Sequence, residues 1–161
     1  MIFKVERARL SECLEVMHAA YDVTAKQFGL TAENCPHRGN ADLPLDELVA
    51  EFDGGAAMFG YLLDGRIVGF LSMGVDGDMA KINDLVVLPE FWHRGIGGEL
   101  VGCAKRFARE RGASTLTLGM IDDNEVLRRW YERHGFVTVR QKKFAGAPFT
   151  VGYMEQKLSD E

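Results

Sequence analysis

The chain has 161 residues, of which 47% are hydrophobic and 27% are charged, the usual mix of one globular domain with a substantial core. Its net charge is −5 and its Lys and Arg residues form no basic stripe, so no nucleic-acid partner is expected, because phosphate neutralisation needs clustered cations. No apolar run reaches the ~18 residues of a membrane span and the N-terminus lacks the pattern of a signal peptide, so we expect a cytoplasmic protein with no membrane partner.

The first third of the chain predicts a strand and two helices. Ile2 to Arg7 reads as a short strand, and Ser11 is a suitable N-cap for the helix that follows. This helix has side chains recurring at helical spacing at Leu14, Met17, His18 and Tyr21. Residues 29–43 read as a loop, and Pro44 can start a second helix that ends at Asp53-Gly54-Gly55.

The middle of the chain predicts an antiparallel meander that leads into a long helix. Met58 to Leu63 and Arg66 to Met73 flank Asp64-Gly65, a strong two-residue hairpin signal. A turn at residues 76–78 leads into a third strand, Lys81 to Leu88. The helix after it has one apolar face, made by Ile96, Leu100, Cys103 and Phe107, and it ends at Gly112.

The last third predicts a strand, a helix and two further strands. Thr115 to Leu118 is the strand, and Asp122 or Asp123 can cap the helix. We expect this helix to direct three apolar side chains inward, namely Val126, Leu127 and Trp130. It should stop at His134-Gly135, before strands over residues 136–140 and 150–157. The predicted fold is a single α/β (α+β) domain over residues 1–161, with a mixed, mostly antiparallel sheet flanked by helices.

A glycine-rich turn joins the third meander strand to the long helix, in the segment Leu88-Pro89-Glu90-Phe91-Trp92-His93-Arg94-Gly95-Ile96-Gly97-Gly98. Glycines allow the backbone to approach a ligand closely, and the first N–H groups of a helix are unpaired. The helix dipole adds a positive end, so the turn predicts a bound diphosphate. No Gly-Lys-Ser/Thr follows, and the third glycine of a dinucleotide fingerprint would fall at Leu100, so neither of those motifs is present.

A second motif runs from Asn124 to Phe136, and with the first it resembles the signatures of the GNAT superfamily. Gln/Arg-x-x-Gly-x-Gly/Ala corresponds to Trp92-His93-Arg94-Gly95-Ile96-Gly97. The second signature, Asn-x-x-Ala-x-x-x-Tyr-x-x-x-Gly-Phe, corresponds to Asn124, Tyr131, Gly135 and Phe136. Two positions depart from it: Trp92 replaces Gln or Arg, and Leu127 replaces the small Ala. The resemblance covers nearly the whole order of elements.

The resemblance implies acetyl-CoA as cosubstrate and direct attack of an acceptor amine on the thioester. It assigns cofactor binding to the strand residues Leu85, Val86 and Val87, to His93, Arg94, Gly95, Ile96, Gly97 and Gly98 in the turn, and to Asn124 and Tyr131. Val86 or Val87 would supply the N–H that stabilises the developing oxyanion. Tyr131 would be the general acid. A phenol near pKa ~10 transfers its proton to a thiolate of pKa ~8.5 uphill by about 2 kcal/mol, so a hydrogen-bonding role fits better unless its pKa is lowered.

The general base is less well specified. An alkyl amine with a pKa near ~10 is protonated at neutral pH and must lose a proton before attack. Asp84 on the third meander strand can accept it, whereas the adjacent Asn83 could only order a water. Glu51 and Asp53 are further candidates. His18, His37, His93 and His134 are scattered along the chain and read as surface or structural residues, His37 being the least typical of these.

The acceptor is expected to contact the region from Tyr21 to Asp53, which is acidic because of Asp42, Asp46, Glu47, Glu51 and Asp53. This favours a cationic amine on a small molecule, and a homodimer is compatible with the sequence. A non-catalytic acyl-CoA-binding module and a transferase for longer acyl groups are alternatives. So is a thiol or metal enzyme built on Cys35, His37 and His18, although Cys13, Cys35 and Cys103 have no metal-ligand spacing and no metal is expected.

Overall fold

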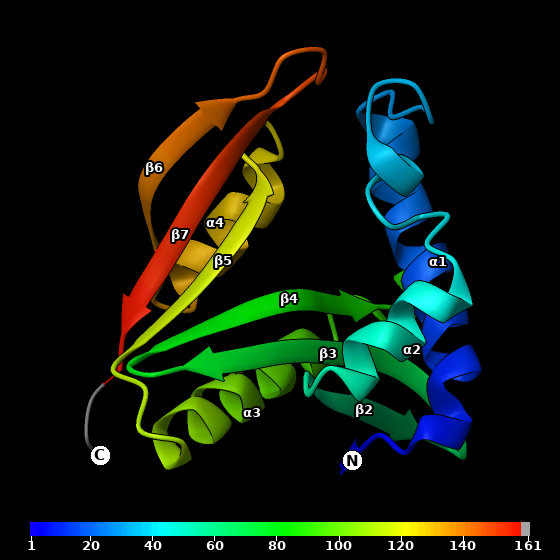
Figure 1. Cartoon of the computed structure of the whole chain (residues 1–161), viewed down its shortest axis with the longest axis vertical. Coiled ribbons are helices and arrows are strands. Elements are labelled where there is room, and N and C mark those ends of the chain that lie inside the picture. Colours follow the sequence, from blue (N-terminus) through cyan, green and yellow to red (C-terminus); the bar gives the residue numbers. More distant parts are fainter. Residues whose placement is uncertain (159–161) are drawn as a thin grey trace.

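A computed structural model describes residues 1–158 of the chain and contains one seven-stranded sheet. The strands are β1 (Ile2–Lys4), β2 (Ala57–Leu63), β3 (Arg66–Asp76), β4 (Met79–Val87), β5 (Thr115–Ile121), β6 (Val137–Lys143) and β7 (Thr150–Lys157). They lie in the order β1-β2-β3-β4-β5-β7-β6 (Figure 1). The β4–β5 pair is parallel and the other pairs are antiparallel. The mixed, mostly antiparallel sheet predicted from the sequence is confirmed.

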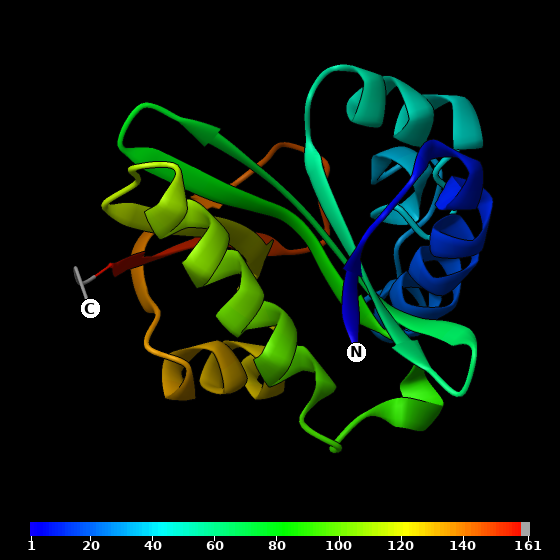
Figure 2. The ribbon, with the colours of Figure 1, turned by 90° about the horizontal axis from the view of Figure 1, so that it is seen from below.

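Helices cover both faces of the sheet, which Figure 2 shows from below. The helices are α1 (Leu10–Gln27), α2 (Leu45–Asp53), α3 (Ile96–Glu110) and α4 (Glu125–Arg133). α1 and α2 lie on one face, and α3 and α4 lie on the other. β3 is covered on both sides, so its residues form a continuous buried run that includes Val68, Phe70 and Leu71, each fully buried.

Two predicted boundaries in the first third need correction. α1 begins at Leu10, directly after a 3₁₀ turn over Arg7–Arg9, so Ser11 lies inside the first turn and caps nothing. The guanidinium of Arg9 instead holds the Glu12 carboxylate with two bonds of 3.1 Å. β1 ends at Lys4, because its partner β2 pairs only with residues 2–4.

The start of α4 also differs from the prediction. Asn124 is its N-cap, and its side-chain oxygen accepts a hydrogen bond of 3.2 Å from the Leu127 N–H, so neither Asp122 nor Asp123 is the cap. Val126 is 78% exposed instead of facing inward, because Leu127, Trp130 and Tyr131 form the inward face of the helix and Val126 lies outside it. Leu127 and Trp130 do pack against the core, as predicted.

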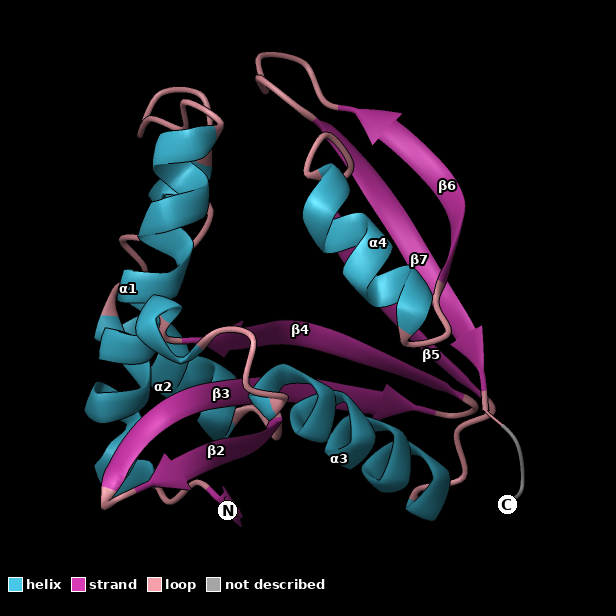
Figure 3. Ribbon diagram, turned by 180° about the vertical axis from the view of Figure 1, so that it is seen from behind, coloured by secondary structure: helices cyan, strands magenta, loops and turns pink. Residues whose placement is uncertain are grey.

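β4 and β5 diverge after a short shared stretch. Residues Met79 to Lys81 of β4 pair with Thr115 to Thr117 of β5, and within the described chain the two strands do not pair beyond this stretch. β4 then contains a bulge, since Met73 of β3 lies opposite Ile82 and Ser72 lies opposite Asp84, which leaves Asn83 as the extra residue. The strands open into a V in Figure 1, and Figure 3 shows the same opening from behind, with α3 and α4 beside it. One edge of β4 is therefore without a strand partner from residue 82 onward.

None of the helices in residues 1–158 is long and apolar enough to cross a membrane.

Candidate active site

The free edge of β4 presents alternate peptide groups to the opening of the V. Leu88 N–H donates to the Val68 carbonyl at 2.8 Å, and Val87 lies opposite Gly69 in the register. In an antiparallel pair the peptide groups of alternate residues point toward and away from the partner strand. The N–H and C=O of Leu85 and Val87 thus point away from β3, into the V. Those of Val86 point to β3, so of the two residues that the sequence suggested as oxyanion donor, only Val87 has an N–H that faces the V.

The strand edge leads to the N-terminus of α3, where backbone donors are exposed. Gly95 is the N-cap residue, with φ of 81°, a left-handed conformation that favours glycine. The first intrahelical bond runs from Glu99 N–H to the Gly95 carbonyl at 3.1 Å, so the N–H groups of residues 96–98 have no helical partner. No side chain of the described chain caps this helix. These donors and the helix dipole form an anion-binding site.

Two further residues of the turn shape its surface. His93 has φ of 64°, which is unusual for a non-glycine residue and holds the turn in a strained conformation. The exposed Arg94 places its guanidinium 5.1 Å from the centre of the Phe91 ring. Arg94 directly precedes Gly95 in the chain, so a cationic residue adjoins the start of α3 in sequence.

Helix packing favours glycine at positions 97 and 98, a reason that the sequence did not suggest. A Cβ at Gly97 would lie 3.0 Å from Cζ2 of Trp130, and one at Gly98 would lie 3.2 Å from Nε2 of His134. Both directions lead to α4, so the two glycines permit close packing of α3 against α4. The ring of His134 stacks on Trp130 with centroids 4.0 Å apart, which completes this contact.

Asp84 lies in the bulged part of β4 and is 3% exposed. Its Oδ1 accepts hydrogen bonds from the Tyr21 hydroxyl at 2.6 Å and from the Asn40 side-chain amide at 3.2 Å. Burial raises the pKa of Asp84, and the two hydrogen bonds act in the opposite direction. No described side chain donates to Oδ2, so that oxygen can accept a proton from a ligand.

Tyr131 lies on α4, across the opening from α1, and its side chain is buried at 6% exposure. Its ring packs edge-to-face on Trp130 and Phe136, with centroids 5.1 and 5.6 Å away. Burial, and then the nearby charge of Asp84, raise the pKa of the hydroxyl above its usual value. The hydroxyl is thus a hydrogen-bond donor at neutral pH, and the lowered pKa that would favour full proton transfer is not found.

Glu51 and Asp53, the other carboxylates considered, have different environments. Burial raises the pKa of Glu51, the charge of Asp84 adds to this, and the Ser72 hydroxyl opposes it. Glu51 therefore lies close enough to Asp84 for the charges of the two carboxylates to interact, and we call this pair the acidic centre. The carboxylate of Asp53 is held by the Arg7 guanidinium at 3.1 and 3.2 Å, which lowers its pKa and makes it a poor base. Asn83 is the bulge residue itself and is exposed.

Tyr21 and Asn40 are site residues that sequence reasoning did not identify. Both lie in the region Tyr21 to Asp53 that was expected to contact the acceptor, but Tyr21 was otherwise only a side chain at helical spacing in α1 and Asn40 only part of a loop. Asn40 has φ of 73°, a left-handed conformation that Asn tolerates better than most residues and that lets its amide reach Asp84. An Asn close to a Gly was a signal for a turn, but its contact with β4 depends on the tertiary fold.

In the described chain, the polar contacts of His18, His37 and the buried thiols do not involve Asp84 or Tyr131. His18 bonds to the Leu43 carbonyl at 2.8 Å, and Nε2 of His37 lies 2.7 Å from the Glu47 carboxylate, so His37 does not activate Cys35. Cys13 and Cys103 are buried, and burial raises the pKa of both thiols, that of Cys13 to about 12. Within residues 1–158 no three His, Cys, Asp or Glu side chains are grouped to hold a metal ion.

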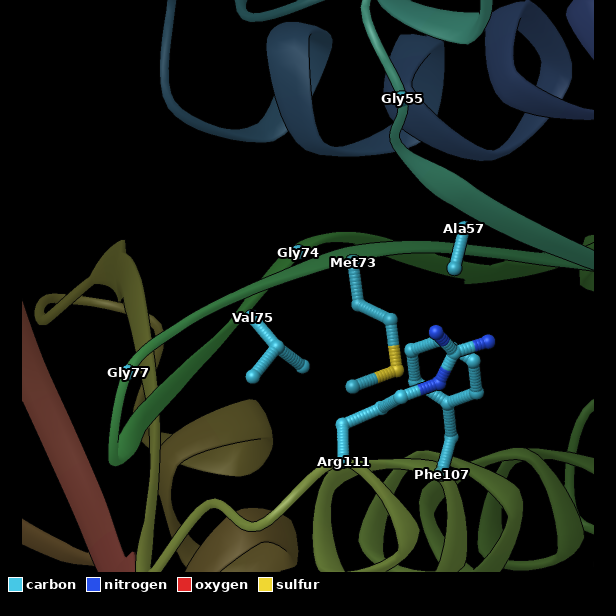
Figure 4. Close-up of a pocket in the computed structure, with 8 residues that line it drawn as sticks. All are labelled: Gly55, Ala57, Met73, Gly74, Val75, Gly77, Phe107 and Arg111. Atoms are coloured by element: carbon cyan, nitrogen blue, oxygen red, sulfur yellow. The ribbon is translucent and has the colours of Figure 1, made fainter.

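A cavity of about 360 Å³ lies at the far end of α3 from the turn. Figure 4 shows Phe107 of α3 and Arg111, directly after that helix, extending toward Met73 and Val75 of β3, with Gly55 and Ala57 above them. The residues of the acidic centre do not line it. The candidate site is therefore the opening between β4 and β5, where α1, the 29–43 loop, α2, β4 and α4 bring together Tyr21, Asn40, Glu51, Asp84 and Tyr131.

Comparison with solved structures agrees with this architecture. The ribosomal-protein-S18-alanine N-acetyltransferase from Escherichia coli superposes with a TM-score of 0.78 at 17% identity, over 99% of this chain and 94% of that one. The PaiA N-acetyltransferase from Thermoplasma acidophilum, crystallised in complex with coenzyme A, has a TM-score of 0.75 at 21% identity, over 98% of both chains. At these identities the likeness establishes the fold.

Sequence comparison assigns the family. A mycothiol acetyltransferase from Clavibacter sepedonicus is 34% identical over 94 residues, which make up 57% of this chain and 31% of that protein. The chain thus spans about a third of that relative. The model of the acetyltransferase (GNAT) family matches residues 17–136, most of the chain and every segment of the candidate site. The chain is a member of the GNAT acetyltransferase family.

Proposed function

We propose that the protein is an acetyl-CoA-dependent N-acetyltransferase that acts on a primary amine, in a complex that holds both substrates at once. The observation that carries this proposal is the continuous path from the unpaired edge of β4 to the uncapped N-terminus of α3, with Asp84 and Tyr131 beside it. Membership of the GNAT family supports the same reaction class.

The residues along this path fit the parts of coenzyme A. The N–H groups of Ile96, Gly97 and Gly98, with Arg94 and His93 in the turn, would hold the diphosphate. The outward peptide groups of Leu85 and Val87 would pair with the amides of the pantetheine arm. The Oδ1 of Asn124 already caps α4, so only its amide nitrogen could donate to the arm. When bound, acetyl-CoA would supply the thioester that the amine attacks.

The chain's own groups would handle the protons and charge of the reaction. Asp84, whose pKa is raised by burial, would accept a proton from the acceptor ammonium at Oδ2. The Val87 N–H would donate to the oxygen on which negative charge develops. Tyr131, protonated because its pKa is raised, would donate a hydrogen bond to the leaving sulfur. The fixed positions of these groups would let the reaction proceed without an enzyme-bound acetyl group.

The acceptor that this site favours is a small cationic amine. Asp84 and Glu51 place two carboxylates on the α1–α2 side of the opening, and Glu51 is exposed at its rim. A positive charge near them would be attracted, and it would relieve the repulsion that contributes to the raised pKa of Glu51. A cation with a second polar group, such as an amino acid amide or a diamine, would engage both carboxylates.

The test is an acceptor screen with acetyl-CoA that measures released thiol. Small primary amines should react, whereas tertiary amines of the same charge should not. Initial rates that vary both substrates should give intersecting lines, and Cys35→Ala should keep this pattern. Parallel lines, or an acetylated Cys35 peptide trapped without acceptor, would favour the thiol-enzyme alternative. A parallel series with longer acyl-CoAs would test the alternative of a longer-chain transferase.

A further inference from the structure

The carbonyl of Val87 already has a donor, supplied by the side chain of Trp92. The indole Nε1–H of Trp92 donates to the Val87 carbonyl with a nitrogen–oxygen distance of 2.7 Å, five residues along the chain. Val87 is 8% exposed as a residue, and its carbonyl points away from β3, so no ladder bond to that strand satisfies it. The indole supplies a hydrogen-bond donor on the edge of β4 that faces away from β3, where the described chain has no paired strand.

The bond from Trp92 shows on which edge of β4 the indole lies, because peptide groups of alternate β4 residues point toward and away from β3. Val87 lies opposite Gly69, and the bond from Leu88 N–H to the Val68 carbonyl shows that the peptide groups of Val87 point away from β3. A donor 2.7 Å from that oxygen must itself lie on the open side of β4. The indole therefore occupies the same strand edge that the proposed function assigns to the pantetheine arm.

We infer that the Trp92 indole occupies the place of a pantetheine amide on the Val87 carbonyl in the free protein, and that coenzyme A displaces it on binding. This inference rests on the proposed function. The indole satisfies the carbonyl while the arm is absent. A carbonyl oxygen can accept two hydrogen bonds, so displacement follows from the indole ring occupying the strand edge on which the arm would lie, and not from the bond alone. Trp92 thus sets the affinity for the cofactor without itself contacting the reacting atoms.

The surroundings of Trp92 allow such a movement. Its side chain is 43% exposed, in contrast to the buried residues of β4 around it. It belongs to the turn between β4 and α3, where the next residue, His93, has a strained positive φ of 64°. The exposed part of the side chain faces solvent into which it can turn, and the movement breaks the hydrogen bond to Val87.

The first experiment compares coenzyme A binding to the wild type and to Trp92→Phe by calorimetry. Phe keeps an aromatic ring but cannot donate a hydrogen bond, so the cofactor no longer has to break one. A net hydrogen bond corresponds to a change in Kd of roughly 2- to 12-fold. The variant should bind coenzyme A more tightly by that factor. Equal or weaker binding by a folded Trp92→Phe variant would overturn the inference.

The second experiment observes the wild type directly by ¹⁵N NMR. The chain has 2 Trp residues and so gives two indole N–H signals, of which the one lost in Trp92→Phe belongs to Trp92. In the free protein this signal should lie downfield and exchange slowly with water, because its proton is hydrogen-bonded. Saturating coenzyme A should move it upfield and speed its exchange. A signal that keeps its shift and protection with coenzyme A bound would contradict displacement.

These readouts separate the inference from the proposed function. If calorimetry detects no coenzyme A binding to the wild type, the proposed function fails and so does the inference built on it. If coenzyme A binds and supports acetyl transfer while the indole bond stays intact, the function stands and only the displacement of Trp92 is wrong.

Discussion

Burial raises the pKa of both Asp84 and Tyr131, and the two shifts have opposite consequences for proton transfer. A carboxylate with a raised pKa is a stronger base, better matched to an ammonium that must lose a proton. A phenol with a raised pKa is a weaker acid, which limits Tyr131 to donating a hydrogen bond until late in thiolate departure. The same apolar surroundings thus favour one of the two groups and restrict the other.

Removing the Tyr131 hydroxyl tests its role. Tyr131→Phe keeps the ring contacts with Trp130 and Phe136, so the fold and coenzyme A affinity should be retained. The turnover number should fall by roughly 10²–10⁴-fold if the hydroxyl assists the leaving sulfur. Steady-state kinetics beside a calorimetric Kd would show this. A variant with unchanged turnover would return Tyr131 to a purely structural role.

The hydrogen bond from Tyr21 makes the base assignment testable by pH. Donation to Asp84 favours the charged carboxylate and so lowers its pKa, against the effect of burial. Tyr21→Phe removes this donor, and the pKa of Asp84 should rise. Because the base acts when deprotonated, the acid limb of the kcat/KM profile should move to higher pH. Profiles for one amine across the stable range would measure the shift.

Two controls accompany this profile. Asn40→Ala removes the longer bond to the same oxygen and should move the limb in the same direction. Asp84→Asn keeps the shape of the side chain but cannot accept the proton, so the limb should vanish along with most of the activity. An acid limb that persists unchanged in Asp84→Asn would assign the base to another group, with Glu51 as the next candidate.

Among the secondary-structure elements, the junction of β4, the turn and α3 forms the proposed cofactor site, and α4 packs against this junction. The bulge at Asn83 separates β4 from β5, which frees the strand edge. Gly97 and Gly98 allow α4 to approach the first turn of α3, where Trp130 and His134 pack against it. The unpaired N–H groups of α3 therefore have a rigid support.

Crowding this helix contact should be destabilising. Gly97→Val adds a side chain whose Cβ alone would lie 3.0 Å from Trp130, so we expect a loss of about 1–3 kcal/mol in the free energy of unfolding. Trp130→Phe removes the part of the ring that clashes, so the double variant should regain part of that loss. Urea denaturation would measure the cycle. Gly102→Val, on the same helix but facing only the end of Arg106, is the matched control. Equal losses in both single variants would show that the cost comes from the helix backbone.

Across the whole molecule, the sheet behaves as two arms joined at the start of β4 and β5. β1 to β4 with α1, α2 and α3 form one arm, and β5, β7 and β6 with α4 form the other (Figure 1). The three paired residues on each strand are the only ladder between β4 and β5 in the described chain. The packing of α3 against α4 also links the two arms, and a ligand in the opening would contact both of them.

Coenzyme A should therefore raise the melting temperature by mass action. At 100 times its Kd a ligand that binds only the folded state adds about 2.7 kcal/mol, which for a domain of this size corresponds to roughly 5–11 °C. Pantetheine, which lacks the diphosphate, should give a smaller shift at equal concentration. Differential scanning fluorimetry would record both. A melting curve unmoved by millimolar coenzyme A would argue against the cofactor assignment.

Much of this protein could be predicted from the sequence because the relevant signals are local. Periods of apolar residues, the Asp64-Gly65 turn and the glycines before α3 specify their own segments, and the order of strands and helices is confirmed. The proposed diphosphate site rests on the same kind of local signal, since a strand, a glycine turn and a helix N-terminus are contiguous in the chain. Helix caps were less predictable, because Asn124 and the two preceding aspartates are chemically equivalent candidates.

Only the tertiary structure decided which side chains meet. The contacts of Asp84 with Tyr21 and Asn40 join residues 63 and 44 positions apart, and no local pattern encodes such separations. The same holds for the packing of Gly97 on Trp130 and for the bulge that frees β4, since both depend on how neighbouring elements pack. The pKa values of Asp84 and Tyr131 follow from that packing, because burial is a property of the assembled core and not of the segment that supplies the residue.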